Sequence, residues 1–152
     1  MAISESNTTP GKTENTVLIV EDEPDYVRLL GESFKNMGYQ IVTANGGHEA
    51  YWYLEKRRTE NAAGIVLVVS DWMMAEGDGL WLLHAIRNGP CRETPFLLIS
   101  GAVNREQLMG VIQMDADAVL LKPFSFEMLR AEAHEAMNRR AIKEANKVIK
   151  GR

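Results

Sequence analysis

The stretch that decides the fold is IVLVVSDWMM, Ile65 to Met74. Its first five residues, Ile65 to Val69, form an unbroken apolar run of mostly β-branched side chains. Such a run is typical of a strand that is buried on both faces, as in the centre of a parallel sheet. Asp71 follows at the expected carboxyl end of this strand, which is where open α/β sheets bind ligands. The stretch therefore predicts an α/β fold and makes Asp71 the first candidate for a functional residue.

Other short apolar runs recur along the chain, and helical spacing of apolar residues separates them. We expect four further strands at Thr16–Val20, Tyr39–Ala44, Pro95–Ser100 and Ala118–Leu121. A strand followed by a helix, repeated five times, predicts a doubly wound parallel sheet with helices on both faces. Because the crossovers are right-handed, the carboxyl ends of all strands meet at one edge of the sheet.

The bulk composition excludes several classes of protein. The 152 residues are 45% hydrophobic and 25% charged, which fits one globular domain. The net charge of −4 gives no basic excess for binding nucleic acid. No apolar run approaches the roughly 18 residues of a membrane span, and the polar N-terminus lacks the apolar segment of a signal peptide. The single cysteine, Cys91, fits a reducing compartment, so we expect a cytoplasmic protein.

The two ends of the chain differ from its centre. Residues 1–15 are rich in Ser, Thr and Asn, and we interpret them as a disordered lead-in to a domain over residues 16–137. Ser125 is a good helix cap, and no helix breaker follows before about Ile149. We therefore expect residues 138–152 to be a basic extension of the last helix.

This extension has two interpretations. Ala141, Ala145 and Val148 form only a thin apolar stripe, which is too poor in leucine for a confident coiled coil. The segment is either a solvated tail or a signalling helix that forms a homodimer or joins an output domain.

The residues just beyond the strand ends carry the chemistry. The first strand is followed by Glu21 and Asp22, the third by Asp71 and the fifth by Lys122, while Ser100 closes the fourth. Three close carboxylates repel one another unless a cation lies among them, and oxygen ligands suit Mg²⁺. Acids, a hydroxyl and a lysine at one edge suit nucleophilic attack by a carboxylate on a phosphoryl group. Asp71 would be the nucleophile, while Lys122 and Ser100 would hold the resulting phosphate.

Four sequence motifs now show a family resemblance. They are VEDEP at 20–24, SDWMMAEGDG at 70–79, LLISG at 97–101 and LKPF at 121–124. With these motifs the chain resembles the receiver domain of two-component response regulators, the CheY-like superfamily, over about Val17 to Met137. The resemblance implies a flavodoxin-like fold whose parallel five-stranded sheet has the order 2-1-3-4-5.

The resemblance also implies roles for individual residues. Asp71 would accept a phosphoryl group from a histidine kinase or a histidine phosphotransfer protein. Glu21 and Asp22 would bind Mg²⁺ together with Asp71, and Met73 would add its backbone carbonyl. Such a protein is a signalling switch that catalyses only its own phosphorylation and dephosphorylation.

Some positions depart from the family pattern. Val119 stands where the family usually has an aromatic residue that couples the site to the face around the last helix, so we expect that coupling to be altered. Ala75 replaces a usual proline, which would loosen the loop after Asp71. Met73 and Ala102 have no side chain that could orient water, so we expect slow autodephosphorylation.

Two other functions are compatible with parts of the pattern. The first is a receiver-like interaction module that works without phosphorylation, which Val119 favours. A complete set of acids, hydroxyl and lysine argues against it. The second is a Mg²⁺-dependent phosphohydrolase, but that class commonly needs a second acid two residues after the nucleophile, where this chain has Met73.

Overall fold

The structure, a computed structural model, describes residues 4–5, 15–60, 64–74, 78–101 and 103–151. Ala75, Ala102 and most of the predicted lead-in lie outside these residues, so the expectations for them stay predictions.

Strands and helices alternate along the chain, as the apolar runs predict. The strands are β1 (Ser4–Glu5), β2 (Thr16–Val20), β3 (Gln40–Ala44), β4 (Ile65–Asp71), β5 (Phe96–Ser100) and β6 (Ala118–Leu121). The helices are α1 (Pro24–Asn36), α2 (Gly47–Thr59), α3 (Gly79–Arg87), α4 (Arg105–Gln113) and α5 (Phe126–Lys150).

The sheet has the order β1-β3-β2-β4-β5-β6. Strands β2 to β6 are parallel to one another, and their order confirms the predicted 2-1-3-4-5 arrangement. One part of the prediction needs correction. Ser4 and Glu5 do not belong to a disordered lead-in, because they form a sixth, antiparallel strand opposite Thr43 and Val42. Without β1, the outer edge of β3 would leave backbone groups unpaired, and any extended segment can pair with such an edge.

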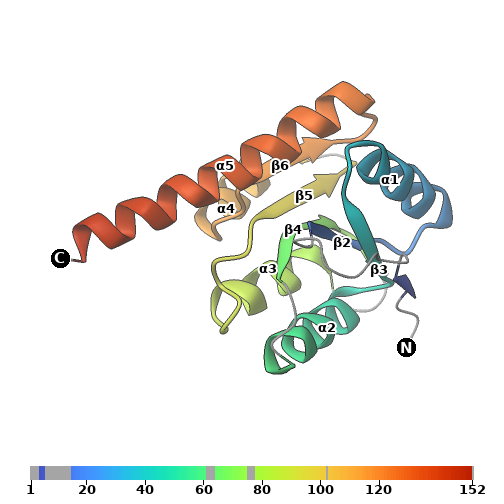
Figure 1. The fold of residues 1–152 in the computed structure, drawn as a ribbon. Helices are drawn as coiled ribbons and strands as arrows, with labels where there is room; N and C mark the ends of the chain where they lie inside the picture. Colours follow the sequence, from blue (N-terminus) through green and yellow to red (C-terminus); the bar gives the residue numbers. More distant parts are fainter. Residues whose placement is uncertain (1–3, 6–14, 61–63, 75–77, 102, 152) are drawn as a thin grey trace.

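Helices cover both faces of the sheet (Figure 1). A hydrophobic cluster lies between the sheet and the helices on each face. Alternate residues of β2 enter different clusters, because successive side chains of a strand point to opposite faces. On one face α1 and α5 contribute Leu30, Phe34, Leu129, Ala133 and Ala136. On the other face α2, α3 and α4 contribute Ala50, Tyr53, Leu54, Leu82, Leu83, Ile86 and Val111. Burying each large aliphatic side chain contributes about 1.5–3 kcal/mol, so this double core holds the strand ends in fixed positions.

A cluster of buried charges fastens α5 to the amino-terminal edge of the sheet. The side chain of Asp117 is fully buried between Arg87 and Arg140, with N–O distances of 2.7 and 2.9 Å. The backbone N–H of Phe96 donates a third hydrogen bond to the same carboxylate, at 2.9 Å. Arg140 is 2% exposed, which is rare for an arginine and is tolerated here because its charge is paired.

Asp115 completes this cluster from the turn before β6. It adopts a left-handed backbone conformation, with φ of 69°. Its carboxylate lies 2.8 Å from Arg140, and its backbone carbonyl accepts a 2.9 Å hydrogen bond from Arg87. Lys143 also pairs with its carboxylate. The packed part of α5 thus extends to Lys143, beyond the predicted domain boundary at residue 137, and the boundary itself stays a prediction.

The last turns of α5 extend past the body of the domain (Figure 1). Ala141, Ala145 and Val148, the predicted apolar stripe, are all exposed. Within the described parts of the chain, no helix has both the length and the apolar character needed to cross a membrane.

The Arg140 cluster gives a test of stability. Replacing Arg140 with Met should lower the free energy of unfolding by about 3 kcal/mol, because the buried carboxylate of Asp117 loses one of its two guanidinium partners. Lys143→Met is the matched control. Lys143 is 43% exposed, so its loss should cost less than about 1 kcal/mol. Urea denaturation measures both, and equal losses would contradict this account of the cluster.

Candidate functional site

The carboxyl ends of the inner strands bring the predicted residues together at one edge of the sheet. Asp71 at the end of β4 lies opposite Ile99 of β5, and Ser100 lies opposite Leu121 of β6. The backbone N–H of Lys122 donates to the carbonyl of Ser100 at 2.8 Å. Hydrogen-bonded neighbours in a parallel sheet therefore place Asp71, Ser100 and Lys122 on three adjacent strand ends.

Three carboxylates converge at this edge. Glu21, Asp22 and Asp71 each offer an oxygen, and these oxygens lie within 4.8 Å of one another. Glu21 and Asp22 occupy the short link between β2 and α1. Pro24 begins α1 only three residues after Glu21, and proline suits the first helical turn. This tight connection keeps both acids beside the end of β4.

Glu21 is the buried member of the three. It is 1% exposed, and its Oε1 accepts a 3.2 Å hydrogen bond from the backbone N–H of Glu23. Its Oε2 is buried and, among the described residues, has no hydrogen-bond partner. Burial raises the pKa of Glu21 to about 7, and the negative charge of Asp71 adds to the effect. Lys122 and the Glu23 N–H oppose the shift only in part.

This arrangement fits a divalent cation. A buried carboxylate oxygen without a donor gains most from a ligand that supplies positive charge. The ligand atoms are all oxygens, and Asp22 is exposed to solvent, which suits an ion that keeps bound water. Glu21, Asp22 and Asp71 are thus the residues that would hold Mg²⁺. The backbone carbonyl of Met73 stays a predicted ligand.

Asp71 is held from several sides. Its Oδ1 accepts a 3.0 Å hydrogen bond from the N–H of Trp72 and lies 3.5 Å from Nζ of Lys122. Gly79, the first residue of α3, packs directly on the Asp71 backbone. A Cβ at Gly79 would lie 2.3 Å from the Asp71 carbonyl oxygen, so glycine is required there. The side chain of Asp71 is 12% exposed, which leaves it open to a reactant.

Lys122 has a partner that the sequence analysis missed. Its Nζ lies 3.9 Å from Oε2 of Glu21 and 3.8 Å from the ring centroid of Tyr26 in α1. The same ring packs against Phe124 at a centroid distance of 6.2 Å. Tyr26 carries no motif signal of its own, since an aromatic residue in a helix normally indicates packing.

The remaining predicted positions lie close to the site. Ser100 is buried at the end of β5. Val119 is partly buried in β6 and packs against the cluster on the α2 and α3 side. Trp72 packs partly against the same cluster, so its ring is a packing residue as well as a neighbour of Asp71. Met73 is 74% exposed.

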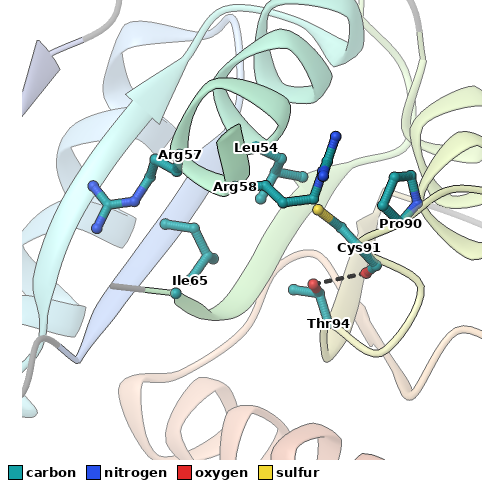
Figure 2. A pocket seen from close by; sticks show the side chains of 8 residues that line it. Leu54, Arg57, Arg58, Ile65, Pro90, Cys91 and Thr94 are labelled. Atoms are coloured by element: carbon teal, nitrogen blue, oxygen red, sulfur yellow. Dashed lines mark hydrogen bonds between the residues drawn. The ribbon is translucent and has the colours of Figure 1, made fainter. Parts of the chain in front are cut away.

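A hollow lies away from these residues, between the end of α2 and the loop before β5 (Figure 2). Its volume is about 290 Å³, and Cys91 lies on its wall with the side chain turned toward Arg58. Arg58 is already paired with Glu55 at 3.0 Å. Burial raises the pKa of the Cys91 thiol, and Glu55 adds to this. A protonated thiol is a poor nucleophile, so this hollow offers no reactive group to compare with Asp71.

Comparison with known proteins agrees with this geometry. The sequence profile of the response regulator receiver domain family matches residues 17–134. A probable chemotaxis protein CheY from Rhizobium etli is 28% identical over 116 residues, covering 76% of this chain and 86% of that protein. The alkaline phosphatase synthesis transcriptional regulatory protein PhoP from Bacillus subtilis is 29% identical over 83% of this chain. The chain spans about half the length of PhoP.

A solved structure has the same architecture. The chemotaxis protein CheY4 of Vibrio cholerae aligns with a TM-score of 0.70 and 25% identity, over 81% of this chain and 98% of that one. The fold and the acidic strand ends define a CheY-like signalling switch rather than a classical enzyme. The chain belongs to the response regulator receiver domain family.

The raised pKa of Glu21 gives a prediction about pH and stability. Without metal, the folded protein binds a proton on Glu21 more tightly than the unfolded chain does. Its free energy of unfolding should therefore fall as the pH rises from 4.5 through about 7. Glu21→Gln has no proton to lose at this position, so the fall in stability is absent. The difference in free energy of unfolding, variant minus wild type, should therefore be larger at about pH 8 than at about pH 5.

Urea denaturation in a chelating buffer measures both proteins, and parallel pH profiles would contradict the assignment. Titration calorimetry is the companion measurement. Mg²⁺ binding to the wild type should strengthen as the pH rises through about 7, because the ion competes with the proton.

Proposed function

We propose that this chain is a phosphorylatable receiver whose phosphoacceptor is Asp71 and whose phosphoryl transfer depends on Mg²⁺. The proposal rests on one observation, which is that a cationic group and two further acids lie close to the carboxylate of Asp71. Nζ of Lys122 lies 3.5 Å from Asp71, while Glu21 and Asp22 lie on the metal-binding side of the same group. This set provides a nucleophile, a cation site and a cationic phosphate ligand at once.

In the proposed reaction a carboxylate oxygen of Asp71 attacks the phosphorus of the donor. The bond from phosphorus to the donor's leaving group breaks, and the leaving group departs with the electron pair. Lys122 and the Ser100 hydroxyl bind the phosphoryl oxygens of the aspartyl phosphate. Bound Mg²⁺ would supply charge neutralisation for the phosphoryl oxygens. Glu21 must lose its proton before it can act as a metal ligand, so the site works best near or above neutral pH.

The proposed donor is a histidine kinase or a histidine phosphotransfer protein. Receiver domains of two-component systems exchange phosphoryl groups with such partners, and the family assignment supports the same class here. A hollow of about 170 Å³ opens beside the site between α1 and the β6–α5 loop. It is lined by Asp25, Tyr26, Leu29, Pro123 and Phe124, and a side chain of the donor protein could dock there.

We further propose that residues 16–137 form the receiver and that residues 138–152 continue α5 as a signalling segment. Ile142, Val148 and Ile149 are 52, 62 and 71% exposed, which suits contact with a second copy or with an output domain. The relative PhoP, named as a transcriptional regulatory protein, is about twice as long as the matched region. A signalling role in the cytoplasm follows from the proposed donors.

The phosphoacceptor can be tested directly. With acetyl phosphate and Mg²⁺, the wild type should gain the mass of one phosphoryl group, and Asp71→Asn should gain none, because an amide is not a nucleophile here. Asp78→Asn is the matched control, since this nearby acid caps α3 through a hydrogen bond to Trp81. Intact mass spectrometry measures the added phosphoryl mass in the wild type and in both variants. An unmodified wild type that also fails to bind beryllofluoride would favour the interaction module that works without phosphorylation.

The lifetime of the phosphoryl group gives a second test. Met73 is exposed next to the site and has no group that can orient an attacking water, so the phosphorylated protein should persist for minutes or longer without a phosphatase. Met73→Glu should shorten that half-life about tenfold or more by adding a base. The decrease of the phosphorylated mass with time gives the half-life for both proteins. A wild-type half-life of seconds would overturn the expectation.

A further inference from the structure

Tyr26 is placed where it can control the lysine of the site. It lies in the first turn of α1, and the face of its ring is 3.8 Å from Nζ of Lys122. This is well within the roughly 6 Å at which a cation and an aromatic face attract. Phe124 packs on the ring at 6.2 Å and fixes it from the β6–α5 side.

Three groups surround the ammonium group of Lys122, and two of them carry negative charge. These are Asp71 at 3.5 Å and Glu21 at 3.9 Å. Both are also members of the acidic cluster that would hold Mg²⁺. When a divalent cation neutralises these carboxylates, their attraction for Lys122 falls and the cation itself repels the ammonium. The uncharged ring of Tyr26 keeps its attraction in that state.

We propose that Tyr26 is a positioning residue for phosphoryl transfer. Its ring holds the ammonium of Lys122 beside Asp71 when the acids are occupied by metal. A lysine side chain has several rotatable bonds. A contact that holds its ammonium group in place reduces the conformational entropy that the side chain loses when it binds the phosphoryl group. This inference rests on the proposed function and assigns a role to a residue outside the acid, hydroxyl and lysine set.

Five variants test the inference with a small-molecule donor, which needs no protein partner. Tyr26→Leu keeps an apolar side chain without a ring, and Tyr26→Phe keeps the ring face without the hydroxyl. Leu29→Ala is the matched control, because Leu29 lines the same hollow one helical turn further along. Tyr26→Leu combined with Lys122→Met, compared with Lys122→Met alone, completes a double-mutant cycle.

At saturating Mg²⁺ we expect Tyr26→Leu to be phosphorylated by acetyl phosphate about three- to tenfold more slowly than the wild type. Beryllofluoride affinity should fall by a similar factor. Tyr26→Phe and Leu29→Ala should stay within about twofold of the wild type. On the Lys122→Met background, Tyr26→Leu should have no further effect, because the cation that the ring holds is gone.

The Mg²⁺ affinity separates positioning from simple damage to the fold. Tyr26→Leu should bind Mg²⁺ within about twofold of the wild type, since the metal acids do not include Tyr26. The inference is overturned if Mg²⁺ affinity and phosphorylation fall together, if Tyr26→Phe is as slow as Tyr26→Leu, or if Tyr26→Leu matches the wild type. A wild type that takes no phosphoryl group at all would instead refute the proposed function.

Discussion

Repulsion among three carboxylates is the constraint on which the site depends. Glu21, Asp22 and Asp71 would separate in a flexible chain, but they follow strands that are buried on both faces and hydrogen-bonded to one another. The free energy of the two hydrophobic clusters thus maintains an arrangement that is unfavourable by itself. Burial raises the pKa of Glu21, and the negative charge of Asp71 adds to this, so a bound divalent cation would favour the ionised form of Glu21. The metal-free site is, in this sense, stabilised by the rest of the molecule.

At the opposite edge of the sheet, a buried carboxylate is stabilised by protein groups alone. There Asp117 is as buried as Glu21, yet Arg87, Arg140 and the N–H of Phe96 satisfy its carboxylate completely. At the functional edge Lys122 offsets only part of the negative charge, and an oxygen of Glu21 has no donor among the described residues. The buried carboxylate of Asp117 is therefore fully paired and stabilises the fold. The carboxylate of Glu21 is only partly paired and can accept a ligand.

The sequence predicts the sheet and the meeting of the candidate site residues at one edge, because both follow from strand patterns. A run of four or five apolar residues marks β2, β4 and β5, and parallel pairing then brings Glu21, Asp71, Ser100 and Lys122 to one edge. Contacts that depend on a side chain from a distant helix leave no such pattern. Arg140 appears in the sequence as a solvated charge, since its partner Asp117 is 23 residues away and meets it only through packing. The pairing of β1 with β3 leaves no such pattern either, because any extended backbone can pair with the edge of a strand.

The position of α5 has a mechanical consequence. The helix is capped by Ser125, three residues after Lys122, and it continues for 25 residues without interruption. At about 1.5 Å per residue it is a rod of roughly 37 Å. Arg140 and Lys143 clamp the rod near its middle, and its last turns stand clear of the domain (Figure 1). Leu129, Ala133 and Ala136 pack the earlier part of the rod onto the sheet, so the turns beyond Lys143 form a cantilever whose direction is set by the packed part.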